Sequence, residues 1–421
     1  MKRVVYLRLF IAFVFCTSSM ASQADMGNNP ELNPRAGLPN FFEKIRQGDT
    51  VKVAYLGGSI TAQNGWRVQS LEWFRLRFPN AAFSQIHAAI GGTGSDFGAF
   101  RLGEHVLKYG PDLVFVEFAV NDNRSPEEKI IRSMESIVRQ IWTHDPATDI
   151  CFVYTTIESF LTKEQGGKLP GSAVTMEKVA ERYNIPSINF GQEIFRLVSN
   201  DQLIITDKRR EVDGIQVFSP DGVHPYPETG HIIYTTVLQR SFEKLADQKQ
   251  RKKKRSLPDA LAPDYYSSPR LVGLSDMNLS ENWKILDFRE DPFFSRFGNF
   301  VSMAGEALPG ASLSFRFIGK AIGAYDFMGP GTGRIVIRID GEVRDTIPRF
   351  DAYCTYTRMS YFIIDGLENK EHQVDITVLS DPFDKAAILA RRGNVMEDPD
   401  KYEEHNWYVA KIMIDGALFK P

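Results

Sequence analysis

The sequence predicts a three-layer α/β/α domain followed by an antiparallel β-sandwich domain. Between about residues 38 and 247, apolar strand-like runs alternate with amphipathic helical runs, the pattern of βαβ units around a parallel sheet. After residue 263 the helical periodicity largely ends and short strand-like runs recur, which favours a sandwich or jelly roll. A length of 421 residues accommodates two such units.

The N-terminus has the order of a secretory signal peptide. Two basic residues precede an apolar run over 4–15, and small residues follow, with cleavage expected after Ala21 or Ala24. The run is too short to span the roughly 30 Å hydrocarbon core of a bilayer. We therefore expect residues 1–24 to be a signal peptide and the mature protein to be secreted or periplasmic, without an integral membrane segment. Lipoprotein anchoring through Cys16 is the less favoured alternative, because a bulky residue precedes it.

Composition excludes several classes of protein. Hydrophobic residues make up 43% and charged residues 24%, with a net charge of −3, so neither a disordered chain nor a nucleic-acid partner is expected. Only Cys151 and Cys354 follow the signal peptide, far apart in the chain. A disulfide framework and a structural zinc site are therefore not expected.

The predicted α/β domain covers 38–247. The third strand is a continuous apolar run broken only by Glu117, as expected of a strand covered on both faces. A helix begins near Ser125, where a proline and two acids suit a first helical turn. Strands are predicted at 51–56, 81–90, 112–120, 150–156 and 185–190, and further helices at 65–78, 175–183 and 228–245.

A basic linker over 248–263 separates this domain from the predicted β-sandwich at 264–421. Its dense run of basic residues, 250–255, is typical of a solvated segment; a patch for an anionic polymer or lipid is the alternative. In the second domain, Asp340-Gly341 lies between alternating segments and predicts a hairpin turn. Strand-like runs occur at 312–318, 321–327, 334–339, 361–364, 372–378 and 408–414.

Ser59 is the candidate nucleophile. It lies in Gly57-Gly58-Ser59-Ile60-Thr61, at the carboxyl end of the first predicted strand and before a helix. Ligands bind at such strand ends in open parallel sheets. Taken alone, the segment is also a common strand-turn-helix junction.

Asp221 and His224 form the second candidate group, in the loop before the last predicted helix. With this spacing, the carboxylate can orient the imidazole while the other ring nitrogen faces a nucleophile. The alternative is that Asp221 is a turn residue and His224 a helix-entry residue.

Two further strand ends offer hydrogen-bond donors. Asn121, in Asn121-Asp122, can donate its side-chain amide to a developing oxyanion. Gly92, in the run 90–95, can donate its backbone N–H. The alternative for each segment is an ordinary turn at the end of a strand.

Together the four segments resemble the SGNH (GDSL-like) hydrolases, whose motifs are Gly-Asp-Ser, a glycine, Gly-x-Asn-Asp and Asp-x-x-His. The resemblance covers roughly residues 51–245 and implies a flavodoxin-like α/β/α fold. Two positions depart from the motifs: Gly58 stands where the family has an aspartate, and Ala119 where it has a glycine. The loss of the aspartate leaves the support of the nucleophile loop open.

The resemblance implies a serine esterase without a cofactor or metal. Ser59, Asp221 and His224 would form the catalytic triad, and Ser59, Gly92 and Asn121 the oxyanion hole. With the added sandwich, the chain resembles carbohydrate O-acetylesterases, so the expected substrate is an acylated carbohydrate. A lipase, lysophospholipase or thioesterase is the closest alternative; an acyltransferase and a weakly active glycan-binding protein are others. The sequence does not specify the oligomeric state.

Other residues allow weaker interpretations. Buried Glu117 needs a partner, for which Arg101 is the candidate. Trp66 either packs in the core or walls a sugar subsite. Aromatic residues of the second domain are core residues or members of a stacking platform, namely Trp283, Tyr325, Tyr353, Tyr356 and Trp407.

Overall fold

A computed structural model describes residues 30–161, 168–248, 254–288, 290 and 294–419. The predicted signal peptide over 1–24, Cys16 and most of the basic run 250–255 lie outside the described residues. Within the described ranges, no helix is both long and apolar enough to cross a membrane.

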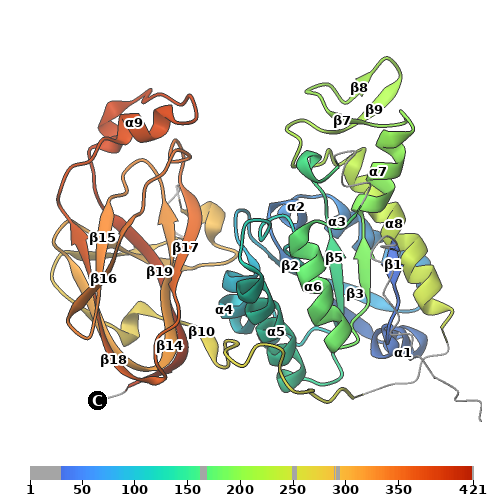
Figure 1. The fold of residues 1–421 in the computed structure, drawn as a ribbon, viewed down its shortest axis with the longest axis horizontal. Helices are drawn as coiled ribbons and strands as arrows, with labels where there is room; N and C mark the ends of the chain where they lie inside the picture. The colour runs from blue at the N-terminus through green and yellow to red at the C-terminus, as the bar shows by residue number, and fades with distance from the viewer. Residues whose placement is uncertain (1–29, 162–167, 249–253, 289, 291–293, 420–421) are drawn as a thin grey trace, which may run out of the picture.

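The first domain is built on a sheet of five parallel strands with one antiparallel edge strand (Figure 1). The spatial order is β1-β6-β5-β4-β2-β3. Taken in chain order, the five parallel strands lie 2-1-3-4-5, which is the flavodoxin-like arrangement, so the predicted fold class is confirmed. The strands are β1 (Leu32–Asn33), β2 (Thr50–Gly57), β3 (Ala82–Ala89), β4 (Leu113–Glu117), β5 (Asp149–Tyr154) and β6 (Ser187–Asn189).

Helices cover both faces of this sheet (Figure 1). One face packs against α1 (Pro39–Gln47), α3 (Trp66–Arg77) and α8 (Gly230–Ala246). The other packs against α4 (Ser95–His105), α5 (Glu127–His144) and α6 (Gly171–Arg182). The short α2 (Ser59–Ala62) and α7 (Gly191–Ser199) begin near the carboxyl ends of β2 and β6.

A small three-stranded sheet stands beside the carboxyl ends of the main strands (Figure 1). It consists of β7 (Ile204–Thr206), β8 (Glu211–Val212) and β9 (Ile215–Ser219). These strands are not predicted from the sequence, because runs of two to five residues carry little periodicity. Its last strand leads directly into the loop that holds Asp221 and His224.

The second domain is an antiparallel β-sandwich, as predicted. Its strands enclose an apolar core that includes Phe315, Ile337 and Trp407. The hairpin at Asp340-Gly341 is present, with both residues at positive φ. The elements are β10 (Pro269–Val272), β11 (Asn278–Leu279), β12 (Trp283–Asp287), β13 (Met303–Ala307), β14 (Ser312–Met328), β15 (Arg334–Ile339), β16 (Glu342–Pro348), β17 (Arg358–Ile364), β18 (Lys370–Leu379), α9 (Lys385–Ala390) and β19 (Trp407–Leu418).

The two runs expected at 312–318 and 321–327 form one strand, β14. A register shift against β19 between Gly319 and Ala321 marks the position where the sequence pattern is interrupted. The strand therefore continues through an irregularity: its first half pairs with β18, its second half with β17, and residues 317–327 also pair with β19.

The two domains share a core along α4, which lies between the main sheet and the sandwich (Figure 1). Phe97 of α4 packs against Tyr325 of β14 with ring centroids 4.8 Å apart. An ion pair of 2.8 Å joins Arg132 of α5 to Asp365. The linker also docks: Arg255 makes a buried 2.6 Å ion pair with Asp149, so at least this end of the basic run is not solvated.

Candidate active site

Ser59 is placed by the end of β2. The strand ends at Gly57, Gly58 is extended with φ of −92°, and Ser59 is the first residue of α2. Its side chain is partly buried at the carboxyl edge of the sheet.

Ser59, His224 and Asp221 form a continuous hydrogen-bonded chain. The Ser59 Oγ lies 2.9 Å from Nε2 of His224, and Nδ1 of the same ring lies 2.8 Å from Oδ2 of Asp221. Residues 165 positions apart therefore meet with the connectivity of a charge relay.

The second carboxylate oxygen of Asp221 is also occupied. Oδ1 accepts hydrogen bonds from the backbone N–H groups of Val223 and His224, at 2.9 and 2.8 Å, and from the Ser219 hydroxyl at 3.0 Å. Partial burial raises the pKa of this carboxyl, but the bonds from the His224 ring and the two backbone N–H groups outweigh it and lower the pKa to about 2. Asp221 thus stays ionised at neutral pH.

Gly222 lets the Asp221–His224 loop turn against the segment after β5. It has φ of +77°, and a Cβ there would lie 2.6 Å from Oε2 of Glu158. The Glu158 N–H also donates to the Gly222 carbonyl at 2.8 Å. A side chain at 222 would be both strained and obstructed.

The two other predicted donors lie beside Ser59. A Cβ built on Gly91 would lie 3.5 Å from the Ser59 Cβ, which places the Gly91-Gly92 turn against the serine. Gly92 has φ of +72° and is exposed. A Cβ built on Gly58 would lie 1.9 Å from Oδ1 of Asn121, so the asparagine side chain occupies the space over this glycine. With the asparagine in this position, a side chain at Gly58 would displace it.

Glu117, at the end of β4, supports the loop that holds Ser59. Its fully buried carboxylate accepts hydrogen bonds from the hydroxyls of Thr61 at 2.7 Å and Thr155 at 2.8 Å, and from the Gly58 N–H. Burial raises the pKa of Glu117, while these hydrogen bonds oppose the rise. The expectation that Arg101 pairs with Glu117 is wrong. The Arg101 guanidinium donates hydrogen bonds to the carbonyls of Ala88 and Gly57 instead.

The weaker aromatic candidates separate by burial. Trp66 is buried against Tyr55 and Phe115, and is a core residue rather than a subsite wall. Tyr325 and Trp407 are core residues of the second domain, and Trp283 packs against Trp407. Tyr353 and Tyr356 are exposed.

Three residues without a predicted role, Asp122, Asp96 and Tyr361, lie around Gly94 at the end of the Gly92 turn. Asp122 accepts a hydrogen bond from the Ser95 N–H at 3.1 Å, and burial raises its pKa to about 7. Its position next to Asn121 is the one sequence feature that could have identified Asp122 as part of the site. Tyr361 comes from the second domain, so no local pattern links it to the site.

The described part of the chain contains no cluster of three or more histidine, cysteine or acidic residues that could hold a metal ion. Cys151 and Cys354 are free and buried.

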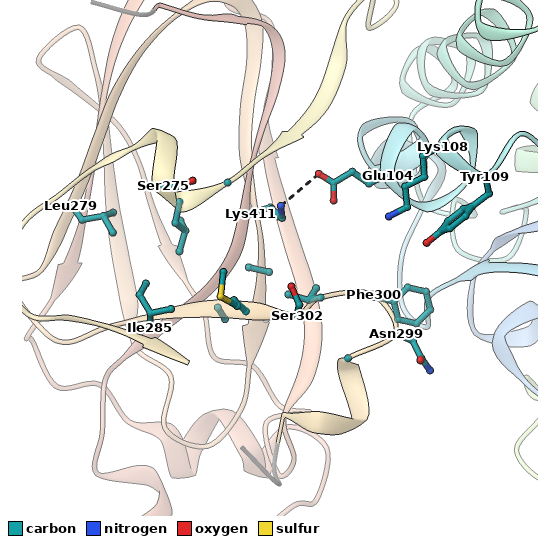
Figure 2. A pocket seen from close by; sticks show the side chains of 17 residues that line it. Glu104, Lys108, Tyr109, Ser275, Leu279, Ile285, Asn299, Phe300, Ser302 and Lys411 are labelled. Atoms are coloured by element: carbon teal, nitrogen blue, oxygen red, sulfur yellow. Dashed lines mark ion pairs between the residues drawn. The ribbon is translucent and has the colours of Figure 1, made fainter. Parts of the chain in front are cut away.

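A cavity of about 690 Å³ between the domains is separate from this site (Figure 2). It is lined by Glu104, Lys108 and Tyr109 near the end of α4, and by the Glu104–Lys411 ion pair of 3.6 Å. Ser95, beside the candidate site, begins the same helix, whose 11 residues span about 16 Å. None of the candidate catalytic residues lines the cavity.

Comparison with known proteins agrees with the fold. The crystal structure of a two-domain esterase (CEX) active on acetylated mannans, co-crystallised with mannopentaose, has a TM-score of 0.72 and 20% sequence identity, and the match covers 93% of this chain and 98% of that one. A further structure of a two-domain esterase (CEX) active on acetylated mannans has a TM-score of 0.67 and 21% identity, over 90% and 94% of the two chains. No curated protein matches the sequence.

At these identities, the structural likeness shows a common two-domain fold. The sequence also matches a family model: residues 55–229 match that of the GDSL-like Lipase/Acylhydrolase family. That segment begins within β2 and ends at the start of α8, so it contains every candidate catalytic residue. The α/β domain of this chain therefore resembles the GDSL-like lipase/acylhydrolases, the SGNH ester hydrolases, over the segment that holds the candidate catalytic residues.

Proposed function

We propose that the chain is an exported serine esterase that removes O-acetyl groups from a polysaccharide or oligosaccharide. The observation that carries the proposal is the hydrogen-bonded chain from Ser59 through His224 to Asp221. A hydroxyl, an imidazole and an ionised carboxylate in this order are the elements of acyl transfer through a covalent intermediate.

In the proposed reaction, His224 Nε2 takes the proton of Ser59 as its Oγ attacks the ester carbonyl. The N–H groups of Ser59 and Gly92 and the amide of Asn121 stabilise the oxyanion. The imidazolium then protonates the ester oxygen of the sugar as its bond to the acyl carbon breaks, and the sugar leaves with a free hydroxyl. Water next attacks the acyl-enzyme by the same relay, which releases acetate and restores the Ser59 hydroxyl. Asp221 holds the imidazole in one tautomer and stabilises its protonated form.

An acetylated carbohydrate is the substrate class that the two-domain architecture supports. The chain aligns over both domains with a structure of an esterase active on acetylated mannans. Acetylated mannans are therefore the first substrates to test, followed by other acetylated glycans.

The decisive experiment measures acetate release from these glycans by the wild type and Ser59→Ala. We expect Ser59→Ala to abolish turnover, because no other group replaces the nucleophile, and to retain the circular dichroism spectrum of the wild type. Equal kcat in the two proteins would refute the assignment of Ser59.

Acyl-chain length separates the proposal from a lipase, lysophospholipase or thioesterase. A deacetylase should lose kcat/KM sharply when p-nitrophenyl acetate is replaced by esters of four or more carbons. Faster hydrolysis of long-chain esters would instead favour a lipid substrate.

A further inference from the structure

The turn that holds Gly92 is anchored from the second domain. Tyr361 of β17 accepts a hydrogen bond from the Gly94 N–H at 3.2 Å, and its own hydroxyl donates to Oδ1 of Asp96 at 2.7 Å. Tyr361 therefore bridges the last residue of the turn and the first turn of α4.

The other anchors of this turn come from the α/β domain itself. The Thr93 hydroxyl donates to the Ile90 carbonyl at 2.8 Å, and the Ser95 N–H donates to Asp122 at 3.1 Å. On its outer side the turn is open: a Cβ built on Gly92 would have no neighbour within 4 Å. No side chain packs over the outer side of Gly92, so these hydrogen bonds contribute to the position of its N–H.

Tyr361 is itself held firmly. Its ring stacks on Phe97 with centroids 4.8 Å apart and planes at 13°. Asp96, which accepts its hydrogen bond, is fixed by a 2.7 Å ion pair with Lys129 and by the Phe97 N–H. Burial and the neighbouring Asp96 raise the pKa of Tyr361 well above its ordinary value, so the hydroxyl stays protonated and continues to donate.

We propose that Tyr361 is a positioning residue for the oxyanion hole, and that the second domain thereby completes the catalytic apparatus. This inference rests on the proposed esterase function. The Tyr361 hydroxyl fixes Gly94, and through it the Gly92 N–H two residues earlier. Oxyanion donors act at about 2.7–3.1 Å from the developing charge, and a misplacement of about 1 Å can cost 10²-fold in rate.

The chain offers a matched control in Tyr325. Tyr325 lies directly opposite Tyr361 in the β14–β17 pair, and its ring also packs on Phe97 at 4.8 Å. Its hydroxyl, however, donates to Sδ of Met359 and not to the turn. Tyr361→Phe and Tyr325→Phe therefore remove the same atom from the same interface, but only the first removes an anchor of the oxyanion turn.

The test compares wild type, Tyr361→Phe, Tyr325→Phe and Ser59→Ala on one acetyl ester. For Tyr361→Phe we expect kcat to fall about tenfold with KM within about twofold. An alkylboronic acid, whose adduct with serine mimics the tetrahedral intermediate, should bind this variant about tenfold more weakly. Tyr325→Phe should stay within about twofold of wild type in all three measurements.

Two results would overturn the inference: Tyr361→Phe retaining wild-type kcat and boronate affinity, or both tyrosine variants losing activity equally, which would indicate general packing. Thermal unfolding of each variant identifies any loss of fold. Activity that survives Ser59→Ala would instead refute the proposed function, and with it this inference, before the tyrosine variants are compared.

Discussion

At the scale of single residues, Glu117 supplies the support of the Ser59 loop that the sequence does not reveal. The family's motif has an aspartate before the nucleophile, and this chain has Gly58 there. The carboxylate of Glu117 binds the Gly58 N–H and the Thr61 hydroxyl from the neighbouring strand. A carboxylate thus supports the nucleophile loop, but it comes from β4.

Replacing this carboxylate should cost both stability and activity. Glu117→Ala leaves buried donors on Gly58, Thr61 and Thr155 without an acceptor, and each such group costs about 1–3 kcal/mol. We expect the free energy of unfolding in urea to fall by about 3 kcal/mol or more, kcat to fall with it, and Glu117→Gln to recover part of both.

Glu72→Ala is the control for this experiment, because Glu72 pairs with Arg75 on an exposed helix face and should shift stability by less than about 0.5 kcal/mol. A Glu117→Ala protein as stable and active as the Glu72 variant would contradict the supporting role.

At the scale of elements, the loops after β2 and β4 interlock. The Asn121 side chain fills the space over Gly58, so the geometry of one loop depends on the size of a residue in the other. The candidate oxyanion donor and the glycine before the nucleophile therefore form one unit.

We predict that Gly58→Ala lowers kcat about as much as Asn121→Ala does, by roughly 10²–10³-fold, because the added methyl displaces the amide. The double variant should be no slower than Asn121→Ala alone. Steady-state kinetics of the three proteins tests this.

Gly103→Ala, in α4 where a Cβ meets nothing within 4 Å, controls for the change of glycine to alanine. Multiplicative losses in the double variant would show that Gly58 and Asn121 act separately.

Sequence patterns located most of these elements and the three residues now joined by hydrogen bonds. The alternation of apolar strand-like runs with helical runs predicts β2 to β6, and Asp340-Gly341 predicts a hairpin. Both patterns are local, so they can be read from neighbouring residues. Contacts between distant segments were not accessible in this way. The partners of Glu117, the docking of Arg255 on Asp149 and the contact from Tyr361 all depend on tertiary packing, which no spacing in one sequence encodes.

At the scale of the whole molecule, the interface between the domains contains a buried histidine. His105, at the end of α4, packs against Phe300 and Tyr325 of the second domain. Burial, together with the positive charges of Arg101, Lys108 and Lys411, lowers its pKa to about 3. The ring is therefore neutral in the folded protein across the physiological range.

Acid should weaken the fold through this residue. Between pH about 6.5 and 3 the unfolded state binds a proton at His105 that the folded state excludes, so this contribution to stability decreases as pH falls, by at most about 1.4 kcal/mol per pH unit. His105→Gln lacks the titrating ring. Urea unfolding of both proteins at several pH values should show the wild type losing stability faster than the variant in acid, and parallel curves would contradict the assignment.

The contact between Gly94 and Tyr361 joins an early and a late part of the chain, because the two residues are 267 positions apart. A growing chain has already completed its nucleophile, its histidine and its carboxylate long before β17 is synthesised. Until that strand arrives, the glycine turn lacks one of its anchors. Under the proposed role of Tyr361, full catalytic competence therefore requires the sandwich, which is synthesised last, to be folded against α4.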